Sequence, residues 1–156
     1  MGEIESSDYV ENHFVFVLCG DSEYIDTLHY SLKALSRFSK CEILVITDLS
    51  RNAAAIEWPN IIDVRTPVAF DNHQASIYLK TGLHKFLPQG RRYCYLDTDV
   101  VAVSRDVDSI FDRYIAPITF AADHSRLGDF SPYAVRCGCL ERYQMEFRVL
   151  QEKLES

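Results

Sequence analysis

The chain lacks the features of several protein classes. None of its apolar runs approaches the roughly 20 residues of a membrane-spanning helix, and residues 1–5 lack the basic-then-apolar order of a signal peptide. Basic side chains are scarce, because 16 lysines and arginines stand against 23 aspartates and glutamates and give a net charge of −7. A protein that holds nucleic acid by neutralising phosphates would carry the opposite sign. We therefore expect a cytoplasmic protein with no membrane span and no nucleic-acid partner.

Paired cysteines are also missing. The five cysteines are an odd number, and only Cys137 and Cys139 lie close in sequence, at a spacing that fits neither a redox pair nor a zinc site. Cys19, Cys41 and Cys94 lie inside or beside apolar runs, where a thiol packs as a small hydrophobe. This usage indicates packing cysteines in a reducing compartment.

Length and composition predict one domain. The 156 residues, of which 47% are hydrophobic, are enough for a single substantial core, and no repeat, linker or low-complexity tract divides them. We expect a single domain over residues 1–156.

Apolar runs alternate with amphipathic stretches along the chain. Continuous apolar runs predict strands, and leucines and isoleucines at spacings of three and four predict helices. The expected strands are 13–19, 41–47, 61–64, 93–99 with an extension over 100–103, and 118–122. The expected helices are 22–40, a weak one over 52–56, 73–87, 106–111 and 143–154. This order predicts the α/β class, with a mostly parallel, Rossmann-like sheet flanked by helices.

The ends of these strands carry acidic residues. In parallel sheets ligands bind outside the carboxyl ends of the strands, which places residues 19–21, Asp48, the pair Asp97 and Asp99, and Asp123 on one edge. Carboxylates gathered on one edge repel one another unless a cation lies among them.

Asp97 and Asp99 are the most informative of these acids. They follow the apolar run Tyr93-Cys94-Tyr95-Leu96 at a spacing of two, so both can lie on one side of the turn where the strand ends. Carboxylate oxygens suit Mg²⁺ or Mn²⁺, which in phosphate chemistry bind one or two carboxylates together with the substrate's phosphates. The alternative is ordinary turn chemistry, since aspartate favours such positions.

Three segments, in order, give the chain a family likeness. They are Val-Leu-Cys-Gly-Asp-Ser-Glu-Tyr at 17–24, Ala-Ser-Ile-Tyr-Leu-Lys-Thr-Gly-Leu at 75–83 with Phe-Leu-Pro at 86–88, and Tyr-Leu-Asp-Thr-Asp-Val-Val at 95–101. Over about residues 12–124 the chain resembles the nucleotide-binding half of metal-dependent glycosyltransferases of the glycogenin and lipopolysaccharide galactosyltransferase kind.

The resemblance implies a function and a set of site residues. The partners would be a nucleotide diphosphate sugar as donor and a carbohydrate, lipid or protein acceptor. The cofactor would be Mn²⁺ or Mg²⁺. The implied donor-binding residues are Cys19, Asp21, Tyr24, Lys80, Asp97 and Thr98, and the implied metal ligands are Asp97 and Asp99. Tyr24 would stack on the base, Asp21 would accept a hydrogen bond from it, and Lys80 would pair with a phosphate. No residue is assigned as catalytic.

The chain departs from the family after Asp99. Only 57 residues of the 156 follow, and the one histidine among them, His124, comes too early to match the family's distant metal ligand. Arg136 stands near the position where the family has an asparagine. A transferase truncated at its C-terminus or compacted, and a domain that binds the donor without transferring its sugar, both stay open.

A phosphatase of the haloacid dehalogenase kind is a further alternative. Its nucleophile also lies at the end of an apolar strand, so Asp97 would accept the phosphoryl group and Asp99 would act as general acid.

Overall fold

The computed structural model describes residues 10–120. The chain divides into two compact units, Met1–Tyr114 and Ile115–Ser156, and every described helix and strand belongs to the first. Four predicted features lie wholly outside the described residues: Asp123, His124, the stretch around Arg136 and the helix over 143–154.

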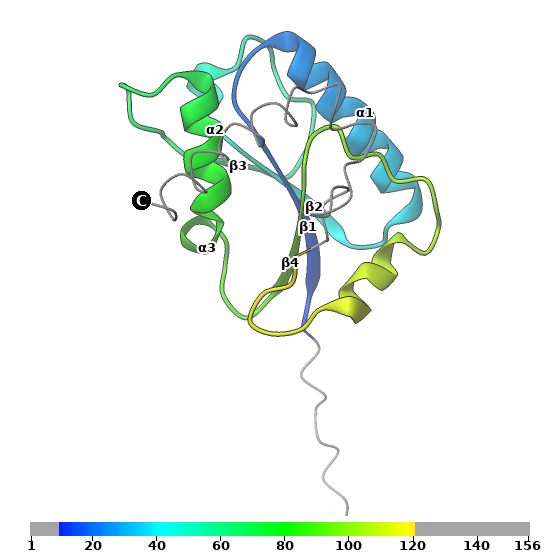
Figure 1. Ribbon diagram of the computed structural model, residues 1–156. Coiled ribbons are helices and arrows are strands. Elements are labelled where there is room, and N and C mark those ends of the chain that lie inside the picture. Colours follow the sequence, from blue (N-terminus) through cyan, green and yellow to red (C-terminus); the bar gives the residue numbers. More distant parts are fainter. Residues whose placement is uncertain (1–9, 121–156) are drawn as a thin grey trace, which may run out of the picture. The chain divides into compact units, whose positions relative to one another are not determined.

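The first unit is built on a four-stranded sheet (Figure 1). Its strands are β1 (Asn12–Leu18), β2 (Glu42–Thr47), β3 (Ile61–Asp63) and β4 (Arg92–Leu96). All pairings are parallel, and the order across the sheet is β3-β2-β1-β4. The predicted α/β class with a parallel sheet is therefore confirmed.

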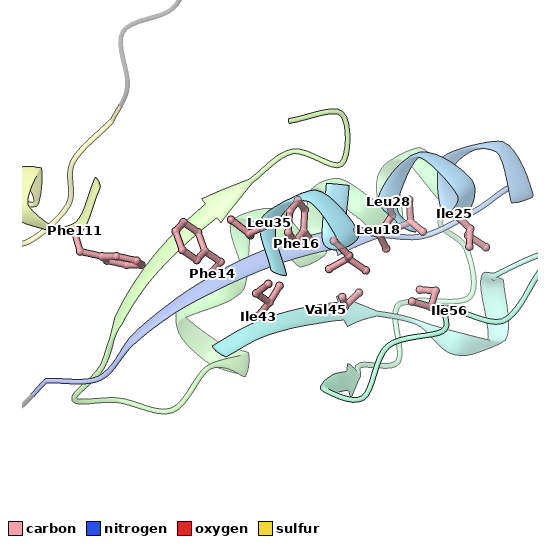
Figure 2. Close-up of a cluster of buried hydrophobic side chains, with 11 residues drawn as sticks. Phe14, Phe16, Leu18, Ile25, Leu28, Leu35, Ile43, Val45, Ile56 and Phe111 are labelled. Atoms are coloured by element: carbon pink, nitrogen blue, oxygen red, sulfur yellow. The ribbon is translucent and has the colours of Figure 1, made fainter. Parts of the chain in front are cut away.

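Helices cover both faces of the sheet. Alternate residues of β1 point to opposite faces, so Phe14 and Phe16 pack under α1 (Ser22–Phe38), as Figure 2 shows. Val15 and Val17 pack on the other face, under α2 (Asn72–Thr81) and α3 (Leu83–Phe86). No helix among residues 10–120 combines the length and the apolar character that crossing a membrane requires.

Two short 3-10 helices complete the unit. The first, η1 (Leu49–Arg51), follows β2, and the second, η2 (Val107–Arg113), places Phe111 edge-on to Phe14, with ring centroids 5.0 Å apart. The weak helix predicted over 52–56 is wrong, because the Asn52 side chain bonds backbone and side-chain groups of two other segments instead of continuing a helix.

Two predicted strands are also absent from the described residues. Residues 100–103 are not a strand, because the Val100 N–H donates to the Asp97 carbonyl oxygen at 3.0 Å and turns the chain away from the line of β4. Residues 118–120, the described part of the predicted strand 118–122, have no strand structure either, and Thr119 bonds the backbone of Ile115.

The long helix predicted over 73–87 is interrupted at Gly82. Its first part begins with a capping box in which Asp71 and Gln74 exchange side-chain bonds to backbone N–H groups. Gly82 then ends α2 and precedes α3, and a Cβ at this position would lie 2.6 Å from the Phe86 ring and 2.9 Å from the Tyr78 carbonyl oxygen. Close contact between the two helices therefore requires glycine here.

A buried carboxylate fixes the loop that follows β3. Asp48, only 1% exposed, accepts hydrogen bonds from the backbone N–H and the hydroxyl of both Ser50 and Thr66. Arg51 adds an ion pair at 3.4 Å and donates to the carbonyl oxygens of Pro67 and Phe70. Burial alone would raise the pKa of the Asp48 carboxyl, but the hydrogen bonds from Ser50 and Thr66 outweigh burial and hold the pKa well below its usual range.

Replacing Gly82 with alanine is expected to destabilise the protein although alanine is the better helix former. The new methyl group must displace the Phe86 ring or the Tyr78 backbone, which should lower the free energy of unfolding by about 1–3 kcal/mol. Lys85→Ala in exposed α3 is the control and should change it by less than about 0.5 kcal/mol. Urea denaturation measures both, and equal values for the two variants would contradict the packing role of Gly82.

Replacing Asp48 with asparagine should lower the free energy of unfolding at pH 7 by about 2–4 kcal/mol, because buried donors and Arg51 lose their charged partner. The folded-state pKa of Asp48 lies below the unfolded value of about 3.9, so its contribution is complete above that pH and is lost as the pH falls. The variant should therefore lose less stability than the wild type between pH 5 and pH 2.5, as urea titrations at several pH values would measure. Asp112→Asn, at an exposed position, is the control, and its free energy of unfolding should fall between pH 5 and pH 2.5 as much as that of the wild type.

Candidate functional site

The order of the strands creates one point where the chain changes direction across the sheet. From β1 the chain passes through α1 to β2 and then β3 on one side, and it returns through α2 and α3 to β4 on the other side of β1 (Figure 1). The carboxyl ends of β1 and β4 therefore adjoin at a topological switch point, where open α/β sheets bind their ligands. The residues that follow these ends are 19–21 and 97–99, both of which were predicted as site segments.

The loop after β1 is held by its neighbours. The Gly20 N–H donates to the Asn52 side chain at 3.3 Å, and the Gly20 carbonyl oxygen accepts from the Ala53 N–H at 3.0 Å. Gly20 has φ of +136°, a conformation that side chains oppose, and a Cβ there would lie 3.4 Å from Asn72. The residues that follow η1 and the start of α2 thus adjoin this loop.

Asp21 and Tyr24 begin α1 at this loop. Asp21 occupies the N-cap position, but its side chain makes no capping bond and is exposed. Tyr24 lies in the first turn of the helix and is 58% exposed. Both side chains are thus accessible beside the switch point, although no described hydrogen bond or ion pair joins either of them to Asp97.

Cys19 differs from these two residues. Its side chain is 6% exposed and packs in the cluster under α2, and burial raises the pKa of the thiol. Its carbonyl oxygen accepts from the Ser76 hydroxyl at 3.5 Å. Because its side chain is buried, Cys19 could contact a ligand only through its main chain.

The turn after β4 is anchored from α1. Phe16 pairs with Leu96 in the last register position of β1 and β4, and Asp97 follows directly. The Thr98 carbonyl oxygen accepts a hydrogen bond of 2.6 Å from Ser31, whose side chain is completely buried in α1. Sequence reasoning missed Ser31; a serine at a position that faces the core of an amphipathic helix was the available signal.

The Asp97 carboxylate is the centre of a small polar cluster. Lys80 Nζ lies 2.7 Å from Asp97 Oδ1, and the Tyr95 hydroxyl donates to the same oxygen. The hydrogen bond from Lys80, followed by that from Tyr95, lowers the pKa of Asp97 against the opposing effect of burial. The side chains of Lys80 and Asp97 are 39% and 55% exposed, so the ion pair contributes only about 0.2–1 kcal/mol.

Tyr95 is the second residue that sequence reasoning missed. It precedes Asp97 by two positions, so both side chains lie on the α2 face, and its ring packs against the cluster under α2. Burial, and after it the hydrogen bond to Asp97, raise the pKa of the phenol, so the hydroxyl stays protonated and keeps donating. Lys80 Nζ lies 5.7 Å from the centroid of the Tyr95 ring.

One face of α2 connects the two loops. Asn72, Ser76 and Lys80 are spaced by four residues and therefore share a face of the helix. Asn72 adjoins Gly20, Ser76 bonds the Cys19 carbonyl and Lys80 pairs with Asp97. The predicted site residue Lys80 thus belongs to a polar stripe that spans the switch point.

The donor set at Asp97 and Asp99 fits a magnesium-type ion held partly by its substrate. Both carboxylates are exposed at the turn, and among residues 10–120 no three histidine, cysteine or acidic side chains converge on one point. Asp48 is committed to the bonds described above. Carboxylates are the residue type that such ions take, one or two at a time, when phosphates and water complete the shell.

Comparisons of the chain with protein-family models, with curated proteins and with solved structures found no match.

Proposed function

We propose that this protein is a metal-dependent glycosyltransferase whose Rossmann-like domain binds a nucleotide diphosphate sugar at the switch point between β1 and β4. The observation that carries the proposal is the pairing there of a flexible cation, Lys80, with the carboxylate of Asp97, two positions before the exposed Asp99. A diphosphate needs cationic partners. Lys80 would be one, and a divalent ion bound by Asp97 and Asp99 would be the second. The likeness of the three sequence segments to the glycogenin kind of transferase supports the same function.

The loop after β1 and the turn after β4 would bind different parts of the sugar nucleotide. Tyr24 and Asp21, exposed at the start of α1, would hold the base by stacking and by a hydrogen bond. Lys80 would pair with a phosphate, and the turn over residues 97–99 would lie at the diphosphate. Ser31 bonds the main chain of this turn, and Tyr95 bonds the Asp97 carboxylate. Because both groups are already ordered, ligand binding would cost less conformational entropy.

The reaction is a substitution at the anomeric carbon of the sugar. The bond from that carbon to the diphosphate oxygen breaks and the nucleoside diphosphate leaves with the electron pair. An acceptor hydroxyl oxygen forms the new bond and passes its proton to the leaving diphosphate. A divalent ion at Asp97 and Asp99 would stabilise the charge on the leaving diphosphate. The acceptor is a carbohydrate, a lipid or a protein hydroxyl.

Removing either carboxylate should abolish the effect of metal on donor binding. We expect Mn²⁺ to raise the affinity for a nucleotide diphosphate sugar at least about tenfold in the wild type, which is about 1.4 kcal/mol. Asp97→Asn and Asp99→Asn should bind the donor equally with and without Mn²⁺, as calorimetry with a panel of such donors would measure. Asp112→Asn is the matched control at an exposed aspartate. Full Mn²⁺ dependence in both site variants would refute the proposed site.

Two tyrosines of α1 provide a test of base stacking. Tyr24→Ala should weaken binding of the nucleoside diphosphate by about 1–3 kcal/mol, because the base loses its stacking face. Tyr30, which is 74% exposed, lies six positions further along the same helix and therefore on another side of it, so Tyr30→Ala should leave the affinity unchanged. Fluorescence titration measures both, and equal losses would show that Tyr24 makes no specific contact.

Turnover separates a transferase from a domain that only binds the donor. Release of nucleoside diphosphate from a bound donor, followed over hours in the presence of Mn²⁺, is the expected result. Tight Mn²⁺-dependent binding without release would favour the donor-binding alternative. Phosphate release from a generic phosphoester that is lost in Asp97→Asn, without donor binding, would favour the phosphatase.

A further inference from the structure

We infer that Lys80 is an exchangeable counter-ion of Asp97: it leaves the carboxylate when a donor diphosphate arrives and so couples diphosphate binding to metal binding. This inference rests on the proposed function, because it assigns a regulation to the same site. Nothing in the likeness of the segments requires it. It comes from the contacts of a single carboxylate oxygen.

The two partners of Asp97 compete with a metal in different ways. Lys80 and Tyr95 both donate to Oδ1, and within residues 10–120 no described contact goes to Oδ2. Lys80 brings a full positive charge, whereas the Tyr95 hydroxyl is neutral. A divalent ion that binds Asp97 would therefore lie next to an ammonium group, and the repulsion between the two cations weakens metal binding.

The two partners also differ in how firmly they are held. The Tyr95 ring is packed against the cluster under α2, so its hydroxyl stays in place and keeps the carboxylate oriented. Lys80 ends a flexible four-carbon chain, and its side chain is 39% exposed. Lys80 can thus leave Asp97 without disturbing the core, while Tyr95 continues to satisfy Oδ1.

The position of Lys80 makes the exchange productive. Its helix face also carries Asn72 and Ser76, which adjoin the loop after β1, so Lys80 lies on the stripe that connects the two loops of the switch point. A diphosphate bound there attracts the ammonium group and frees Asp97 for the ion. The coupling is reciprocal, so bound metal must raise the affinity for diphosphate by the same factor.

The first test uses Mn²⁺ alone. Lys80→Gln should bind Mn²⁺ about tenfold more tightly than the wild type, the gain expected when an ammonium about 5 Å from a doubly charged ion is removed in water. Electron paramagnetic resonance of free Mn²⁺ measures this binding without any nucleotide. Lys80→Arg keeps the charge and Lys85→Gln removes an exposed lysine of α3, so neither should show the gain. The double variant Lys80→Gln with Asp97→Asn should lose it.

The second test measures the coupling. Affinities for uridine, adenosine and guanosine diphosphates are determined with and without saturating Mn²⁺, and their ratio for the nucleotide that binds is the coupling factor. Lys80→Gln should lower this factor about tenfold, because the variant already binds Mn²⁺ tightly without nucleotide. The same substitution therefore strengthens binding of the metal alone and weakens binding of the nucleotide.

Each contrary result has a distinct meaning. Equal Mn²⁺ affinity of the wild type and Lys80→Gln overturns the exchange, while Mn²⁺-dependent nucleotide binding would leave the proposed function standing. A gain that survives in the double variant places the ion away from Asp97 and also overturns the exchange. A gain at Asp97 in a protein that binds none of the three nucleotides overturns the proposed function, and the exchange with it.

Discussion

The parallel pairing of β1 with β4 is the constraint on which the candidate site depends. It places the end of β4 beside the end of β1, although about 80 residues separate them in sequence. Without this pairing, the loop over residues 19–21 and the turn over residues 97–99 would have no reason to adjoin. The pairing itself rests on the core, because Phe14 and Phe16 of β1 belong to the buried cluster against which Cys94 and Leu96 of β4 pack.

The alternation of side chains along β4 then decides which groups meet. Tyr93 and Tyr95 lie on the α2 face, so the next odd position, Asp97, meets α2 and its Lys80. The even positions face α1, where Ser31 binds the Thr98 carbonyl oxygen. A shift of one residue in the register of β4 would exchange the two faces and separate Asp97 from Lys80, while Tyr95, two positions earlier in the same strand, would move with it.

The sequence was sufficient for the parallel sheet and for most of its covering helices, but not for the contacts among the candidate site residues. Continuous apolar runs predicted β1, β2 and β3 within one residue, because a buried parallel strand leaves a simple signal, but the strand predicted over 93–99 ends at Leu96. The helix over 73–87 was predicted as uninterrupted, whereas the structure divides it at Gly82, and the glycine itself was the local signal for the break. Ser31 was missed because its role depends on the Thr98 carbonyl oxygen, 67 residues away. Tyr95 lies only two positions before Asp97, and the alternation of side chains along the strand was the available signal for it.

Asp48 and Asp97 show why position on the sheet edge alone does not identify a functional carboxylate. Both follow the end of a strand, and the sequence assigned them to the same edge. Asp48 is buried and surrounded by donors from Ser50, Thr66 and Arg51, so it is committed to holding a loop. Asp97 is exposed, its hydrogen bonds from residues 10–120 go to one oxygen only, and its charged partner, Lys80, has a flexible side chain. Position at the end of a strand is therefore shared by both carboxylates, while the hydrogen bond from Tyr95 distinguishes Asp97 as an exposed carboxylate whose orientation the fold holds.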